Sequence, residues 1–396
     1  MEQRATRNLI VATVLFTISF WAWNIVAPLG THYTEQLDLS PNQKSLLVAM
    51  PVLVGSVGRI VAGGLTDRFG GRRMMPLLMV VAAPFVLLIA VAGNADSYGL
   101  LVVFSFFLGI AGTTFAVGIP FLNAWYEKSR RGFATGIFGA GMGGTALSAF
   151  FTPRFVDWFG YTMTHLIVMV AMLVAAGLGW LLMTDSPEWK PSTEPFVPKL
   201  VGALRLGVTW QLSLLYAVTF GGFVAFSTYL PTYLNDIYDF DLTEAGTRTA
   251  GFAIAAVIAR PVGGVLSDRI GPKPVVSVSL LGAAVMAVVV ALQPEPEIPA
   301  GTAFVLLALF LGLGSGGVFA WVAVSAPSAQ VGSVTGLVGA AGGLGGYFPP
   351  LVMGATYDVI GHGYTVGLSL LTIVALLTLA YTQVALRSPK QPADSA

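Results

Sequence analysis

Long apolar runs alternate with short charged or proline-containing stretches along the whole chain. Twelve of these runs are long enough to cross the hydrocarbon layer of a bilayer as a helix, which takes about 20 residues. They lie near residues 9–30, 43–65, 74–93, 98–124, 133–153, 161–184, 208–231, 245–267, 274–292, 300–323, 331–353 and 364–386. Strands of a transmembrane β-barrel would instead alternate in polarity over about 10 residues. The pattern therefore predicts an all-α polytopic membrane protein with twelve transmembrane helices.

Composition agrees with this prediction and excludes other classes of protein. The 396 residues are 55% hydrophobic and only 10% charged, whereas an average soluble domain has about 25% charged residues. A chain of this length with so few charges could not cover its own surface in water. Cysteine is absent, which excludes disulfides and thiolate metal sites. The net charge of +1 gives no reason to expect a nucleic-acid partner.

The distribution of Lys and Arg predicts which way the helices run. Arg4 and Arg7 precede a first apolar run that is longer than the core of a signal peptide and has no clear cleavage site, so we expect an uncleaved helix. With both termini cytoplasmic, fifteen Lys and Arg fall on the inner side and three, Lys44, Arg154 and Arg248, on the outer side. This bias follows the positive-inside rule and predicts a cell (inner) membrane protein with both termini cytoplasmic.

A repeat divides the chain. Residues 59–70 read RIVAGGLTDRFG and residues 260–271 read RPVGGVLSDRIG, with seven of twelve positions identical at an offset of 201. A second repeated segment is TGIFGAGMGG (135–144), which resembles TGLVGAAGGL (335–344) at an offset of 200. Because half of the chain is 198 residues, the repeat predicts two six-helix halves of parallel topology. Parallel halves with a central site between them are typical of the major facilitator superfamily.

The predicted division has three parts. Residues 1–184 form the N-terminal six-helix bundle, 185–207 a cytoplasmic linker, and 208–396 the C-terminal bundle with a short cytoplasmic tail. The two bundles are expected to be pseudo-symmetric, which is the major facilitator fold.

The loops after the second and eighth helices, GGLTDRFGGRR and GGVLSDRIGPK, resemble the cytoplasmic loop signature of that superfamily. Their glycines permit close helix approach, and their acidic residues are placed to pair with basic groups on the same rim. The loops could serve only as turns and topology determinants, but their matching positions in both halves favour a gating role. The candidate gating residues are Gly63, Asp67, Arg68, Gly70, Gly264, Asp268, Arg269 and Gly271.

Two arginines stand inside the predicted membrane interior. Arg59 and Arg260 occupy equivalent places in the two halves, and all nineteen acidic residues are assigned to the rims. An arginine at mid-membrane costs at least about 2.5–3.5 kcal/mol and is retained where it has a partner or a wet cavity. A guanidinium stays charged and presents a planar fork of donors suited to oxyanions. Either arginine alone could cap backbone carbonyls or reach an interface, but the symmetric pair without counter-ions predicts a small anionic substrate.

The same inventory bears on what drives transport. No carboxylate or histidine is placed in the membrane interior to take up a proton. Exchange of one anion for another, or facilitated transport, is therefore favoured weakly. Proton symport would have to proceed through water, the substrate or residues nearer the surface.

Three segments resemble the nitrate/nitrite porter family of the major facilitator superfamily: residues 109–147, 214–234 and 334–350. The two glycine-rich stretches resemble the nitrate signatures of that family, and the likeness extends over most of the chain. The resemblance implies that Arg59 and Arg260 bind the substrate, that Phe115 and Phe220 sandwich the planar anion, and that Tyr216 hydrogen-bonds to it. It also implies that signature glycines line the site: Gly136, Gly139, Gly143, Gly336, Gly339, Gly342 and Gly343.

One position departs from the family pattern. Many members have an asparagine in the first signature where this sequence has Met142, so a side-chain donor to the substrate is missing. Nitrate-over-nitrite preference is therefore open, and a carrier of another small anion, such as cyanate or a short carboxylate, is the alternative.

The wider inventory of the spans argues against other activities. An enzyme would need a convergent acid, base or metal-ligand set, which the spans lack, and a sensor would usually add a soluble signalling domain, for which no loop is long enough. The sequence thus predicts a secondary active nitrate or nitrite transporter without a cofactor. Its partners would be the anion, the lipid bilayer and, for symport, protons, and one chain would suffice for a pathway.

Overall fold

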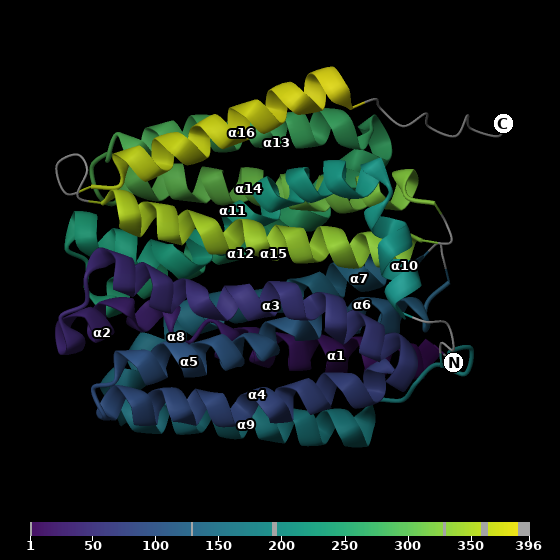
Figure 1. The fold of residues 1–396 in the computed structure, drawn as a ribbon, viewed down its shortest axis with the longest axis horizontal. Helices are drawn as coiled ribbons and strands as arrows, with labels where there is room; N and C mark the ends of the chain where they lie inside the picture. Colours follow the sequence, from purple (N-terminus) through teal and green to yellow (C-terminus); the bar gives the residue numbers. More distant parts are fainter. Residues whose placement is uncertain (1, 128–129, 192–195, 328–329, 358–362, 387–396) are drawn as a thin grey trace.

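The computed structural model describes residues 2–127, 130–191, 196–327, 330–357 and 363–386, and all regular secondary structure in these ranges is helical. Helices α1 to α9 lie together in one bundle and α11 to α16 in a second, with the short helix α10 beside them (Figure 1). Helix α1 begins and α16 ends on the same side of the molecule, here named the termini side. The opposite side is named the far side.

The helix bounds follow the predicted runs closely. The first bundle contains α1 (Glu2–Trp23), α2 (Gly30–Leu37), α3 (Pro41–Phe69), α4 (Gly71–Asn94), α5 (Tyr98–Leu108), α6 (Thr114–Asn123), α7 (Arg131–Gly139), α8 (Gly144–Phe159) and α9 (Tyr161–Leu182). The second contains α11 (Gly207–Tyr238), α12 (Leu242–Ile270), α13 (Pro272–Ala291), α14 (Ile298–Ser325), α15 (Val331–Thr356) and α16 (Thr365–Ala385), and α10 spans Phe196–Leu204.

Eleven stretches of the described chain are long and apolar enough to cross a membrane. The remaining predicted run is α15, which has the length but carries eight glycines among its 26 residues. Glycine adds little to hydropathy, so composition alone understates this helix. The structure is that of a multi-pass membrane protein with the twelve-run organisation that the sequence predicts. The tail beyond residue 386 and residues 192–195 of the linker lie outside the described residues.

Three predicted spans are interrupted in a way the pattern did not predict. Short 3-10 turns at Ala27–Leu29, Gly109–Thr113 and Ala140–Gly143 break the first, fourth and fifth spans. A 3-10 turn replaces the bonds of an α-helix with tighter ones and changes where its carbonyls point. Two of these turns lie beside the arginines, as described below. The linker helix α10 was likewise not predicted, because the segment reads as polar and proline-containing.

Backbone conformation repeats across the halves with the offset found in the sequence. Helices α3 and α12 are both 29 residues long and both begin with a capping box, at Ser40 and at Asp241. Both end at a glycine with positive φ, at 82° for Gly70 and 86° for Gly271. Each of these pairs is separated by 201 residues, so the repeat extends to caps and turns.

The two bundles touch from the far side down to the arginines. Gly354 packs on Ser45, and Gly343 packs on Ser56, along the contact between α15 and α3. Gly246 packs on the backbone of Ala149, where α12 meets α8. Several glycines of the facing helices nearer the termini side lack such close contacts. An added Cβ would meet no atom within 4 Å at Gly63, Gly136, Gly139, Gly264, Gly332 and Gly336. The close glycine packing between the bundles is therefore found on the far side and not at these glycines nearer the termini side.

Gly271→Ala tests the turn that ends α12. A Cβ there would meet nothing within 4 Å, so any loss comes from the positive φ, which costs a non-glycine residue about 1–3 kcal/mol. We expect a lower thermal unfolding midpoint for the purified protein in detergent. Gly177→Ala in α9 is the matched control, because its site is also open but its helical backbone suits alanine. Equal midpoints for the two variants would contradict the strain argument.

Candidate functional site

Arg59 lies in the middle of α3 and is only 2% exposed. Its Nε donates to the carbonyl of Gly112 at 3.4 Å, and its Nη1 donates to the carbonyl of Gly339 at 3.0 Å. The first carbonyl belongs to the 3-10 turn Gly109–Thr113. Gly109 lets that turn approach α3 closely, since a Cβ there would clash with the carbonyl of Pro51 and with Val54. The irregular backbone thus fixes the buried guanidinium.

Arg260 occupies the equivalent place on α12 and is partly exposed. Its Nη1 donates to the sulfur of Met142 at 2.8 Å, and its Nη2 donates to the hydroxyl of Tyr216 at 3.0 Å. Met142 lies in the 3-10 turn Ala140–Gly143. A thioether is only a weak acceptor, so this guanidinium is held less firmly than that of Arg59.

Each arginine bonds across the interface between the bundles. Arg59 of the first bundle donates to Gly339 of the second, and Arg260 of the second donates to Met142 of the first. Neither guanidinium forms an ion pair with a carboxylate in the described part of the chain. A guanidinium has five N–H donors and each of these uses two, so both retain donors for a further acceptor.

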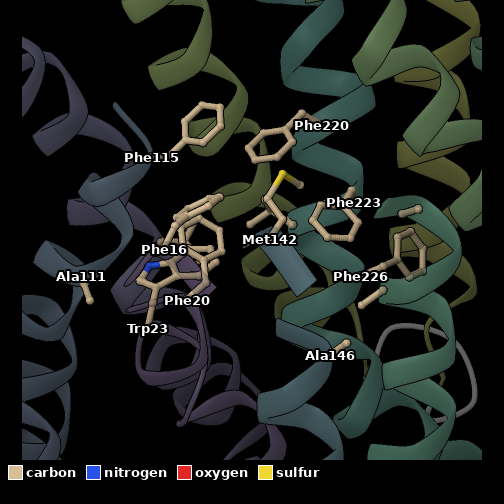
Figure 2. Close-up of a cluster of buried hydrophobic side chains, with 14 of the residues drawn as sticks. Phe16, Phe20, Trp23, Ala111, Phe115, Met142, Ala146, Phe220, Phe223 and Phe226 are labelled. Carbon is tan, nitrogen blue, oxygen red and sulfur yellow. The ribbon is translucent and has the colours of Figure 1, made fainter. Parts of the chain in front are cut away.

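Two phenylalanine rings define a narrow slot beside the guanidiniums. The rings of Phe115 on α6 and Phe220 on α11 are nearly parallel, with centroids 6.5 Å apart and planes inclined by 17° (Figure 2). The guanidinium carbon of Arg59 is 5.1 Å from the first ring and 5.6 Å from the second. That of Arg260 is 5.7 Å and 5.5 Å from them. Both positive groups therefore border the same space.

The rings shape this space and keep water out, but they do not attract an anion themselves. An aromatic face carries negative charge density, so it favours the guanidiniums by cation–π attraction. Both rings are almost fully buried, at 3% and 0% exposed. The exclusion of water lowers the local dielectric constant, which strengthens the attraction of the guanidiniums for a negative ion. The arrangement can bind a small flat anion.

Tyr216 completes one wall. Its ring stacks on Phe220 with centroids 4.8 Å apart and planes inclined by 3°. Gly342 makes this stack possible, because a Cβ there would overlap the ring of Tyr216. Gly339 contributes its carbonyl to Arg59, and Gly343 packs on Ser56. The second signature therefore contributes to the site and to the interface.

The first signature behaves differently. Gly139 and Gly143 approach no other element, since an added Cβ would meet nothing within 4 Å. The close contacts of this segment come from Gly141, which packs on Phe16, and Gly144, which packs on Thr17 and Phe20 of α1. The glycines that the resemblance singled out here face open space, and their neighbours do the packing.

The loop-signature residues occupy matching places in α3 and α12, from Gly63 and Gly264, one helical turn after the arginines, to the glycines that end the two helices. Gly63 and Gly264 approach no neighbour, and Gly70 and Gly271 end α3 and α12. Arg68 lies over the ring of Phe69 at 5.6 Å. Asp268 and Arg269 stand in the last turn of α12.

Asp67 lines a cavity of about 80 Å³ together with Asp185 and Trp189. Asp185 accepts a hydrogen bond from the backbone N–H of Arg72 at 3.2 Å, at the start of α4. A carboxylate is favoured at the positive end of a helix dipole. Asp185 therefore ties the linker to the first loop, a contact that the sequence did not reveal.

Phe319 on α14 is a site residue that sequence reasoning missed. Its ring is perpendicular to that of Phe115 and lies 5.2 Å from the guanidinium of Arg260. The internal repeat could have found it. In the first half, the pair Leu108-Gly109 comes before the pair Phe115-Ala116. In the second half, the pair Leu311-Gly312 comes before Phe319-Ala320 in the same way, with a spacing that is one residue longer.

Comparison with known proteins identifies the family of this chain. The sequence pattern of the Major Facilitator Superfamily matches residues 12–350 and 212–396. The probable nitrate/nitrite transporter NarK2 of Mycobacterium tuberculosis is 58% identical over 382 residues, covering 96% of this chain and 97% of the relative. The nitrite extrusion protein of Bacillus subtilis is 34% identical over 376 residues, covering 95% and 93%. The chain belongs to the nitrate/nitrite porter family of the major facilitator superfamily.

The fold of the porter agrees with this assignment. A bacterial homologue of the human lysosomal transporter Spinster, solved in an inward-facing and occupied conformation, superposes with a TM-score of 0.73 at 17% identity, covering 95% of the porter and 96% of that chain. Members of the superfamily are transporters, so the porter is a transporter and not an enzyme. The prediction of family and fold from the sequence is confirmed.

Gly342→Ala tests the packing behind Tyr216. The added Cβ would push on the ring and move the hydroxyl away from Arg260, and overpacking of this kind costs about 1–3 kcal/mol. We expect a clear loss of substrate transport in proteoliposomes and a lower unfolding midpoint. Gly332→Ala on the same helix is the control, because a Cβ there meets nothing within 4 Å. Normal transport by Gly342→Ala would show that the wall tolerates displacement.

Proposed function

We propose that the porter carries nitrate or nitrite across the cell membrane by alternating access, with the anion bound between Arg59 and Arg260. The observation that carries this proposal is the pair of parallel rings 6.5 Å apart, bordered by two guanidiniums without a carboxylate partner in the described chain. The names of the relatives support the choice of anion: the Mycobacterium tuberculosis and Bacillus subtilis proteins are named for nitrate/nitrite transport and nitrite extrusion.

The dimensions of the slot favour a flat ion. Two van der Waals contacts of about 3.5 Å each, one on either face, need about 7 Å between ring planes. The ring centroids are 6.5 Å apart, so the rings must move apart to admit a flat ion, and a thicker tetrahedral ion needs a larger movement. The guanidiniums at its border offer planar forks that match oxygens in one plane. Tyr216, with its hydroxyl already on Arg260, stands ready to donate to the same ion.

The bonds across the interface link occupancy to movement. A bound anion competes with Gly339 and Met142 for the guanidinium donors, and it also cancels part of the repulsion between the two positive groups. The bundles then lose the hydrogen bonds from Arg59 to Gly339 and from Arg260 to Met142, and both arginines bind the same anion instead. This exchange is the event that we assign to switching between an interface open on one side and an interface open on the other.

The division and the orientation complete the proposal. The bundles comprise residues 1–184 and 208–396, joined by the linker 185–207. The bias of Lys and Arg in the sequence predicts that the termini lie in the cytoplasm, so under this proposal the termini side of the structure is the cytoplasmic side. One chain supplies both arginines and both rings, so a monomer suffices for transport.

Substitution of the arginines tests the site directly. In proteoliposomes loaded with nitrite, we expect Arg59→Lys and Arg260→Lys each to lose most nitrate uptake. Lysine keeps the charge but not the fork, and a charge-assisted hydrogen bond is worth about 1.5–3 kcal/mol, or roughly 10–150-fold in affinity. Arg248→Lys, at an exposed ion pair on the far side, is the control. Full transport by the double lysine variant at positions 59 and 260 would disprove the arginine site.

A competition panel tests the choice of anion. Nitrate and nitrite are each expected to inhibit uptake of the other, and tetrahedral perchlorate is expected to compete weakly. Cyanate and short carboxylates such as formate are included because they represent the alternative substrate class. If they displace nitrite and nitrate does not, the porter carries another small anion.

Met142→Asn tests what the departure from the family pattern does. The amide offers an oxygen to Arg260 and a donor to the substrate, and one neutral hydrogen bond is worth about 1 kcal/mol, or roughly fivefold in affinity. We expect the apparent affinity for nitrate to rise by this factor relative to nitrite, measured from the concentration dependence of uptake. An unchanged ratio would mean that the thioether does not influence selectivity. Met142→Leu, which removes the acceptor without adding a donor, separates the two effects.

A further inference from the structure

Four buried hydroxyls without a hydrogen-bond partner lie between the slot and the far side, and we name them the hydroxyl row. They belong to Ser227, Thr228 and Thr232 on α11 and to Thr249 on α12, and each residue is 2% exposed or less. Many other buried hydroxyls of this chain bond to a carbonyl three or four residues earlier in their helix. Buried polar groups without a protein partner are usually met by water or a ligand.

The hydroxyl row continues the helix faces that carry the anion site. Ser227 and Thr228 come seven and eight residues after Phe220, two turns further along the same side of α11. Thr249 comes eleven residues before Arg260, three turns away on the same side of α12. At 1.5 Å per residue these separations are about 10–12 Å and about 16 Å. The row therefore begins where the slot ends and leads toward the far side.

The first bundle meets the hydroxyl row at the break that follows α1. The 3-10 turn Ala27–Leu29 packs against α11 and α12, and an added Cβ on the next residue, Gly30, would lie 3.0 Å from the hydroxyl of Thr232. Asn24, in the same break, is 3% exposed, and its amide nitrogen has no partner either. Amide and hydroxyl groups both donate hydrogen bonds. Both bundles thus contribute unpaired donors to this part of their contact.

The outer end of the hydroxyl row lies beside an ion pair between the bundles. Asp236 follows Thr232 by one turn of α11, and its carboxylate is 2.8 Å from the ammonium of Lys44 on α3. The two charged side chains are only 7% and 14% exposed. The sequence assigns both residues to the outer rim but does not reveal that they are paired. Because the two charges balance, an anion at the end of the row meets no net charge.

An anion that leaves the arginines toward the far side needs donors that replace part of its hydration. Hydroxyls supply hydrogen bonds without a positive charge, so they hold an anion more weakly than a guanidinium does. Such binding suits a pathway, where an ion must be held strongly enough to enter and weakly enough to leave. We propose that the hydroxyl row is a second binding site, through which the small oxyanion passes between the slot and the far side. This inference rests on the proposed function, because it concerns the route of the same anion.

Valine in place of Thr228 or Thr249 tests the row in the full chain, because it keeps the branched shape and removes the hydroxyl. In proteoliposomes loaded with nitrite, we expect Thr228→Val and Thr249→Val each to lower the maximal rate of nitrate uptake about fivefold, the factor for one neutral hydrogen bond. Calorimetry on the purified protein is expected to give wild-type affinity for nitrate, because the slot is unchanged. Thr228→Ser and Thr249→Ser retain the hydroxyl and are expected to retain most of the rate.

Thr378→Val is the matched control for these variants. Thr378 is also buried, at 3% exposed, but its hydroxyl bonds to the carbonyl of Val374 within α16. This helix lies at the outer edge of the second bundle, away from the first (Figure 1). We expect the control to transport nitrate at the wild-type rate.

Each result decides the question. Wild-type rates in both valine variants overturn the second site and leave the hydroxyls to water. Equal losses in the valine and serine variants, or in Thr378→Val, assign the effect to packing and overturn it too. A nitrate affinity that falls in parallel with the rate places the hydroxyls in the slot and also contradicts a second site. Wild-type protein that transports neither nitrate nor nitrite refutes the proposed function instead.

Single cysteines provide a second measurement should a valine variant fail to fold. The chain has no cysteine of its own, so Thr249→Cys introduces one unique thiol into the row. During exchange we expect a membrane-impermeant, negatively charged methanethiosulfonate reagent to modify this thiol and inhibit uptake, and Thr378→Cys to stay unmodified. A Thr249→Cys protein that transports nitrate but does not react overturns the second site.

Discussion

Two guanidiniums share a dry space with no carboxylate to neutralise them in the described chain, and most features of the centre follow from this constraint. Their charges must be met by weaker groups when no ion is bound, so two backbone carbonyls, a hydroxyl and a thioether accept their hydrogen bonds. Supplying those acceptors requires irregular turns in two spans and glycines close to α3 and α11. Under the proposed function, the bound anion supplies the charged acceptor that both guanidiniums lack in the described chain.

On the far side the charges balance instead, because the ammonium of Lys44 and the carboxylate of Asp236 are 2.8 Å apart. There a carboxylate and an ammonium satisfy each other in a buried setting, and such a pair is weak evidence for stability because desolvation offsets much of the attraction.

The sequence predicts the fold well because length, apolarity and the repeat offset are properties of single segments. The offset of 201 reappears in caps and turns, from Ser40 with Asp241 to Gly70 with Gly271. It predicts Arg59 and Arg260 because a charge in an apolar run is conspicuous. It fails where a role depends on a partner from elsewhere: Phe319 is one of 25 phenylalanines, Asp236 looks like any rim carboxylate until Lys44 is beside it, and Gly141 and Gly139 differ only in what faces them.

The acceptors of the two arginines differ in kind, and this difference bears on how the site can diverge. Arg59 bonds to main-chain oxygens, which no change of side chain can remove, while Arg260 bonds to the side chain of Met142. The acceptors of Arg59 are therefore set by the path of the backbone, whereas a single substitution can remove the Met142 acceptor of Arg260. Under the proposed function, a substitution at position 142 therefore changes an acceptor of Arg260 and leaves the hydrogen bonds of Arg59 in place.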